Sequence, residues 1–84
     1  MADRLHLLQL GIADRLVRKH ANAVVTAALL RAQALAVTDD MYGTGPYADQ
    51  VEEELVESLP PIRGAEARSE YAARLRLVAE GVVQ

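Results

Sequence analysis

The chain of 84 residues has no cysteine, no phenylalanine and no tryptophan, and three tyrosines are its only aromatic residues. The missing cysteines exclude disulfides and thiolate metal sites. Without large aromatic residues, the core has to be built from leucine, valine, isoleucine and alanine, whose burial contributes about 25 cal/mol per Å². A single domain of this length stabilises itself only marginally, so such a core would gain from the surface of a second chain.

Proline and glycine are also scarce in the first half of the chain. Residues 3–38 contain no proline and only one glycine, and thirteen of the residues from Ala21 to Val37 are apolar. The apolar positions recur at intervals of three and four, as they do in a helix. We therefore expect one long helix over about residues 3–38. A break near residues 20–22 is the alternative, although no proline or glycine lies there to cause it.

The apolar character of this long helix predicts self-association. A helix that is apolar on nearly all sides must be surrounded by partners, and the rest of the chain can cover only one broad side of it. We expect a homodimer in which two copies of the helix pack antiparallel about a two-fold axis. Another arrangement would be a structural subunit whose first helix completes a larger bundle. The residues expected at the dimer interface are Leu16, Ala23, Ala27, Leu30, Ala34 and Val37.

The second half of the chain predicts two shorter helices. Two glycines and a proline mark a loop over residues 39–46, and a helix should follow over about 46–59 until two consecutive prolines end it. A third helix is expected over about residues 65–83. The predicted fold class is therefore all-α: three helices of long, short and medium length in a single domain over residues 1–84, forming a helical bundle completed by dimerisation.

The net charge of −3 hides an uneven distribution of charge. Residues 1–38 carry five basic and two acidic side chains, a balance of +3, whereas residues 39–84 carry four basic and ten acidic ones, a balance of −6. An acidic run of this kind is either a solvated helix face or a docking surface for a second, basic protein. The residues expected to dock such a partner are Tyr42, Tyr47, Asp49, Glu52, Glu53, Glu54 and Glu57.

A short basic cluster, Arg15, Arg18 and Lys19, offers an anion-binding site on the first helix. The pI of about 5.2 is far from that of nucleic-acid-binding domains, so we expect no nucleic acid partner. His6 and His20 are the only histidines, and their fourteen-residue separation is about 21 Å along a helix, too far for one metal ion. No catalytic set or phosphate-binding loop is present, so we predict no catalytic residues, metal or cofactor.

In outline, the chain is similar to the small all-helical chorismate mutases. The similarity lies in a long first helix carrying arginines, Lys19 and Gln33, with two shorter helices behind it. It implies an intertwined dimer that binds a dicarboxylate between arginine and lysine side chains, with a glutamate or glutamine near the reacting ether. The motif is incomplete, because no Arg-Glu pair leads the second helix and no lysine follows Arg31 in the first.

These observations favour a small, non-enzymatic interaction protein, namely a regulator, adaptor or accessory subunit that self-associates and docks a partner with its acidic helix. The alternative is a small dimeric enzyme or ligand-binding protein for an anionic metabolite held by Arg15, Arg18 and Lys19. Eight arginines against one lysine suggest a high-GC bacterial genome. The first residues lack the layout of a signal peptide and no apolar run is long enough to span a membrane, so we expect a soluble cytoplasmic protein.

Overall fold

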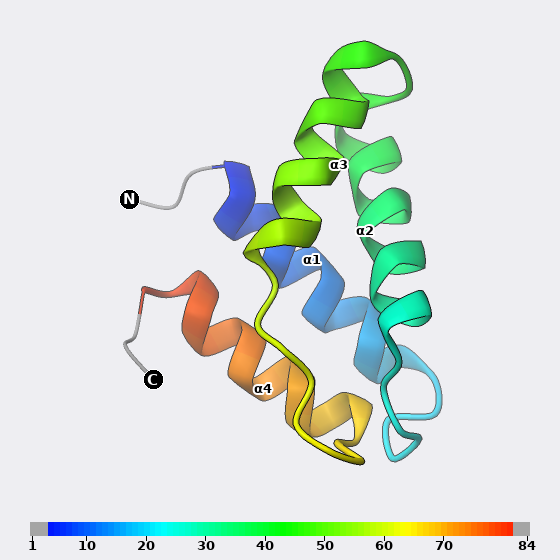
Figure 1. The fold of residues 1–84 in the computed structure, drawn as a ribbon, viewed down its shortest axis with the longest axis vertical. Helices are drawn as coiled ribbons and strands as arrows, with labels where there is room; N and C mark the ends of the chain where they lie inside the picture. Colours follow the sequence, from blue (N-terminus) through cyan, green and yellow to red (C-terminus); the bar gives the residue numbers. More distant parts are fainter. Residues whose placement is uncertain (1–3, 82–84) are drawn as a thin grey trace.

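The structure is a computed structural model that describes residues 4–81, and it is all-helical, as predicted (Figure 1). The prediction of three helices is wrong, because the expected long first helix is divided in two by residues 19–26. The break near residues 20–22 that the sequence left as the alternative is the one observed. The four helices of the described part are α1 (Arg4–Arg18), α2 (Ala27–Tyr42), α3 (Pro46–Ser58) and α4 (Arg68–Ala79).

The helices form two antiparallel pairs that are inclined to each other. In Figure 1, α2 and α3 stand upright as a hairpin, while α1 and α4 run side by side at a slant. The radius of gyration is 12.1 Å, close to the roughly 12 Å expected for a compact chain of this length. The fold therefore closes around its own core.

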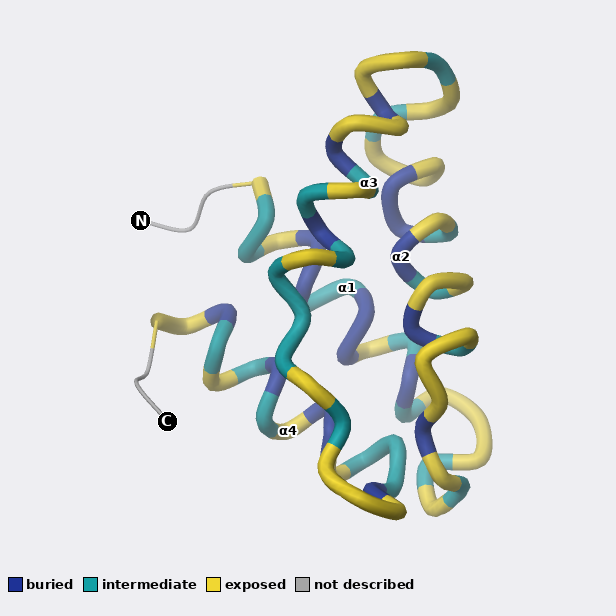
Figure 2. The backbone as a smooth tube through the Cα atoms, viewed as in Figure 1, coloured by how far each residue is buried: buried dark blue, intermediate teal, exposed yellow. Residues whose placement is uncertain are grey.

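The core occupies the space between the two helix pairs (Figure 2). It contains most of the apolar stripe of the expected first helix, that is, the apolar positions that recur there at intervals of three and four. Four of the six residues expected at a dimer interface are buried within the single chain, namely Leu16, Leu30, Ala34 and Val37, at 1%, 6%, 0% and 4% exposure. Their apolar character is thus explained by intrachain packing. Ala23 is half-buried and Ala27 is exposed, so self-association through these positions stays a prediction.

The helix breaks after Arg18 because the following residues pair with the start of α4. The backbone N–H groups of Arg68 and Ser69 donate to the carbonyls of Ala23 and Ala21, at 2.8 and 2.9 Å. These bonds satisfy free N–H groups of the first turn of α4, whose N-cap residue, Ala67, has no side-chain oxygen. Residues 21–25 therefore form a loop whose carbonyls accept hydrogen bonds from α4, instead of continuing α1 as a helix.

Two residues mark the ends of this break. His20 has a φ of 55°, a left-handed conformation in which histidine is found more often than most non-glycine residues. Thr26 is extended, and its hydroxyl oxygen accepts a hydrogen bond from the N–H of Leu29 at 3.1 Å. Thr26 is thus the N-cap of α2. Val24 and Val25 before it are β-prone, but the surrounding alanine- and leucine-rich pattern favours a helix, so the sequence alone does not predict this boundary.

The turn between α2 and α3 is shorter than predicted: α2 continues to Tyr42, so residues 39–42 of the expected loop 39–46 are helical and only residues 43–45 form the turn. Gly43 and Gly45 have φ values of 72° and 121°, which only glycine adopts readily, and Pro46 occupies the first turn of α3.

Helix α4 begins at Arg68, later than the expected residue 65. It ends at Ala79, earlier than the expected residue 83, because Glu80 caps it and Gly81 has a φ of 81°; residues 82 and 83 lie outside the described residues.

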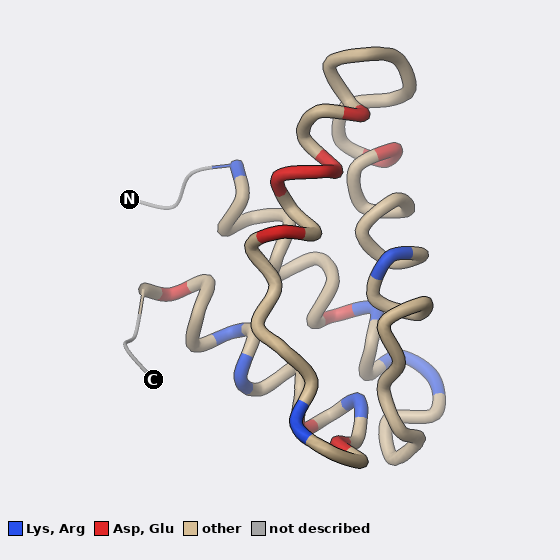
Figure 3. The backbone as a smooth tube through the Cα atoms, in the orientation of Figure 1, with Lys and Arg blue, Asp and Glu red and all other residues tan. Residues whose placement is uncertain are grey.

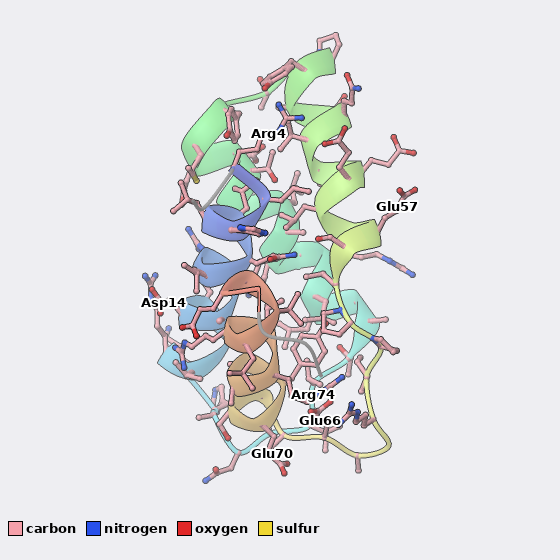
Figure 4. All side chains as sticks on the ribbon, turned by 90° about the vertical axis from the view of Figure 1, so that its left-hand side faces the viewer. Arg4, Asp14, Glu57, Glu66, Glu70 and Arg74 are labelled. Carbon is pink, nitrogen blue, oxygen red and sulfur yellow. The ribbon has the colours of Figure 1, made fainter. Side chains whose placement is uncertain are left out.

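A buried ion pair fixes the segment between α3 and α4. Figure 4 shows Glu66 and Arg74 next to each other beside the start of α4. Nη1 of Arg74 donates to both carboxylate oxygens of Glu66, at 2.6 and 2.9 Å, and Nη2 donates to the carbonyl of Pro61 at 3.0 Å. The side chain of Arg74 is 14% exposed and that of Glu66 is 6% exposed. The backbone N–H of Arg63 adds a hydrogen bond to the same carboxylate at 3.1 Å.

Tyr71 of α4 also belongs to this network. Its ring is fully buried, lies 5.5 Å from the guanidinium of Arg74, and its hydroxyl donates to the carbonyl of Pro60 at 2.6 Å. Burial raises the pKa of Tyr71 to about 12. Burial alone would also raise the pKa of Glu66, but hydrogen bonds from Arg74 and Arg63 and their charges outweigh it and hold that pKa below its usual value. The network therefore contains a charged carboxylate at neutral pH.

We expect Thr26→Ala to lower the free energy of unfolding by about 1 kcal/mol, because the first turn of α2 loses its cap. Thr26→Ser keeps the hydroxyl and should remain close to the wild type. Urea unfolding followed by circular dichroism measures both variants. Equal stability of the alanine and serine variants would show that the hydroxyl does not define the start of α2.

We expect Glu66→Gln to lower the free energy of unfolding by about 3 kcal/mol at pH 7, because Arg74 is left buried without its counter-charge. A lowered carboxyl pKa contributes stability above the unfolded-state value of about 4.3 and loses it as pH falls through the folded-state value. The difference between wild type and variant should therefore shrink below about pH 4.3.

Glu70→Gln is the matched control for this experiment. Glu70 lies four residues after Glu66, in the first turn of α4, but it is exposed, and among the described residues it accepts a hydrogen bond only from the N–H of Ala67, at 2.9 Å. Its loss should cost about 1 kcal/mol or less. Equal losses at the two positions, or a pH-independent loss for Glu66→Gln, would show that the buried charge pair is not the stabilising feature.

Candidate functional site

A cavity of about 280 Å³ opens where the end of α1, the loop after it, α2 and the start of α4 meet. We call it the basic pocket. It brings together the three anion-binding residues predicted from the sequence and adds three more. Its lining residues are Arg15, Arg18, Lys19, His20, Gln33 and Arg68.

The charges in the basic pocket are poorly balanced. No carboxylate is among the lining residues, and Arg15 alone has a counter-charge, in an ion pair with Asp40 on α2. In the described part of the chain, Arg18, Lys19 and Arg68 have no ion pair. Three cationic groups from two helices and a loop therefore face one small space in a protein whose net charge is −3.

Arg68 is the residue that the sequence prediction missed. Its Nη1 donates to the carbonyl of Lys19 at 3.1 Å, and its Nε is buried without a hydrogen-bond partner among the described residues. No local pattern connects a residue at the start of α4 to the end of α1. The connection arises only because the loop between α1 and α2 docks on the N-terminus of α4.

Helix stability accounts for part of the pocket but not for all of it. Arg15 and Arg18 lie in the last turn of α1, where the partial negative charge of the helix terminus favours cations. Arg68 is the first residue of α4, where the positive end of the helix dipole disfavours a cation. Arg68 therefore does not stabilise its own helix by its charge. It contributes instead a hydrogen bond to the loop and a cationic group to the basic pocket.

The acidic residues predicted to dock a partner lie along α3 (Figure 3). Asp49, Glu53 and Glu57 follow one another at intervals of four, are exposed, and form no ion pair with another described residue. In Figure 4, Glu57 lies on the outer side of this helix. Glu52 is half-buried, and Glu54 pairs with Arg4 at 3.1 Å. Three of the five carboxylates are thus both exposed and without an ion pair to a described residue.

Tyr42 and Tyr47 are engaged within the chain. Their ring centroids are 5.8 Å apart at an interplanar angle of 72°, an edge-to-face contact. Arg4 donates to the hydroxyl of Tyr47 at 2.8 Å and lies 5.7 Å from its ring centroid. The hydrogen bond to Glu54 and the nearby tyrosines raise the pKa of Arg4 above its usual value. These contacts join the start of α1 to α3, and they leave Tyr47 54% exposed.

The described residues contain neither a cluster of metal ligands nor a membrane-spanning helix. Nowhere in residues 4–81 do three or more histidine or carboxylate side chains gather as they would around a metal ion. None of the helices formed by these residues is both long and apolar enough to cross a membrane.

The structure lacks the long first helix on which the resemblance to chorismate mutases was based. That resemblance required one long first helix, whereas α1 has 15 residues and α2 has 16. Gln33 lies on α2, on the far side of the loop from Lys19. Both residues nevertheless line the basic pocket, so the anion-binding part of the prediction has a geometric counterpart without the family fold.

Comparison with known proteins identifies no family for this chain. No protein-family model matches this chain, and neither a curated protein nor a solved structure shows significant similarity to it.

Proposed function

We propose that this chain is a binding protein for a small multivalent anion, held in the basic pocket. The observation that supports the proposal is the convergence of Arg18, Lys19 and Arg68 on a cavity without a lining carboxylate. Bringing like charges together is unfavourable unless an anion lies between them. An anion there would receive charge-assisted hydrogen bonds, which are about twice as strong as neutral ones.

The lining residues suit phosphate and carboxylate groups. Arginine presents a planar fork that binds either group through two parallel hydrogen bonds, and lysine adds a compact charge. The volume of about 280 Å³ is close to the lower limit of roughly 300 Å³ for ligand pockets, so the ligand should be small. A long nucleic acid is a poor candidate, because the acidic face of α3 would repel its phosphates.

We expect millimolar phosphate, pyrophosphate or citrate to raise the melting temperature of the protein, since ligands that bind only the folded state stabilise it. Arg18→Ala should weaken binding about tenfold or more, the value of a charged hydrogen bond. Thermal-shift titration followed by calorimetry measures both effects. The stabilisation should decrease as sodium chloride is added, because salt screens exposed charges.

Arg31→Ala is the matched control for charge. Arg31 lies on α2, is exposed, forms no ion pair with another described residue, and does not line the basic pocket. The control should bind these anions as the wild type does. Equal weakening by Arg18→Ala and Arg31→Ala would indicate a general charge effect and contradict a built site.

A second candidate function is docking of a basic protein on the acidic face of α3. The supporting observation is the column of Asp49, Glu53 and Glu57, whose like charges at intervals of four destabilise the helix by about 0.2–0.5 kcal/mol per pair. A cationic partner would relieve this repulsion. A homodimer and a cytoplasmic location, both expected from the sequence, stay predictions alongside it.

We expect a synthetic lysine-rich peptide to bind the wild type in low salt and to lose most of its affinity for the double variant Glu53→Gln, Glu57→Gln. The control is Asp39→Asn, Glu80→Gln, which has the same net charge but changes exposed carboxylates on α2 and after α4. Fluorescence anisotropy measures the binding. Equal affinity of the two double variants would mean that α3 is not the docking surface.

A further inference from the structure

A second cavity lies between α1 and α2 next to the basic pocket, and we call the two cavities together the groove. The second cavity has a volume of about 180 Å³ and shares Arg15 and Arg18 with the basic pocket. Its far end is apolar. The residues that line that end are Leu7, Gly11, Val37 and Met41.

The spacing of the lining residues shows that one face of each helix builds the whole groove. Positions 7, 11, 14, 15 and 18 share one face of α1, and positions 33, 37, 40 and 41 share one face of α2. The positions on α1 span about 16 Å at 1.5 Å per residue. The groove therefore runs from the basic end at Arg18 to the apolar end at Leu7.

Gly11 sets the depth of the apolar end. A Cβ atom at this position would lie 3.2 Å from Cγ1 of Val37, a tight contact that would require Val37 to move by a few tenths of an ångström. Val37 is 4% exposed, whereas Leu7 and Met41 are 49% and 50% exposed. Two large apolar side chains thus stand on either side of a shallow floor and remain half open to solvent.

The acidic residues of the groove are already neutralised. Asp40 pairs with Arg15, and Asp14 pairs with Arg76 of α4 at 3.3 Å. The charges left over are those of Arg18, Lys19 and Arg68, all at one end. The groove consequently has a cationic end and an apolar end, with paired charges between them.

We propose that this groove binds a soluble amphiphilic anion, with its phosphate or carboxylate head in the basic pocket and a short apolar chain over Gly11, between Leu7 and Met41. The inference rests on the proposed function and adds the class of ligand to it. Charge complementarity orients the molecule, because an anionic head is favourable only near Arg18, and burial of Leu7 and Met41 favours an apolar chain at the other end.

Calorimetric titration with inorganic phosphate, butyl phosphate and hexyl phosphate tests this ligand class. Affinity should increase about twofold for each added methylene group. This corresponds to roughly half of the free energy of burying a methylene completely, because the groove is shallow. In the double variant Leu7→Gln, Met41→Gln, hexyl phosphate should bind no more tightly than phosphate does. Thermal unfolding of that variant checks that it is folded.

Leu35→Gln is the matched control for this variant. Leu35 is 47% exposed, lies on α2 and does not line the groove. This control should keep the full dependence on chain length. Persistence of that dependence in Leu7→Gln, Met41→Gln, or its loss in Leu35→Gln, would overturn the assignment of the chain to this groove.

The outcomes separate the inference from the proposed function. If phosphate binds and requires Arg18, but chain length has no effect, the inference fails and the proposed function stands. If none of phosphate, pyrophosphate, citrate and the alkyl phosphates binds, both fail. Binding to phosphatidylcholine vesicles containing phosphatidic acid, without binding to hexyl phosphate, would show a membrane surface as the source of the anion and would overturn a soluble ligand.

Discussion

The buried pair of Glu66 and Arg74 is the interaction on which the rest of the fold depends. It holds the chain after α3 extended against α4, with help from the carbonyl of Pro61 and the N–H of Arg63. In this position the carbonyl of Glu66 accepts a hydrogen bond from the N–H of Val25 at 2.9 Å. One ion pair therefore places the loop before α4 and, through it, the loop between α1 and α2. A buried charge without this geometry would be strongly unfavourable.

The same contacts build the basic pocket. Once residues 21–25 lie against the first turn of α4, the carbonyl of Lys19 comes within hydrogen-bond distance of Arg68. Helix α2 then folds back along α1, so that Gln33 lines the same pocket as Arg18. The pocket is thus a consequence of the way in which the helix break is stabilised. The structural role of the loop and the proposed role in anion binding depend on the same residues.

Charge is separated in space as well as along the chain. The acidic residues of α3 lie along one helix (Figure 3), while Arg18, Lys19 and Arg68, which have no ion pair to a described residue, gather where α1, α2 and α4 meet. The sequence predicted this asymmetry and three of the pocket residues, because the composition of each half shows it directly. It could not predict Arg68, since that residue lies 49 positions from Lys19 and only tertiary contact joins them.

By itself, the sequence determined the all-α class, the turn at residues 43–45, the approximate extent of α3 and the apolar stripe that became the core. Each of these depends on neighbouring residues: on helical periodicity, on glycine with positive φ, or on proline in a first turn. Only the tertiary structure decided that the first helix divides, because local propensity there favours a continuous helix. The hydrogen bonds that residues 21–25 make with α4 outweigh that propensity, and helix propensities are too small to resist such contacts.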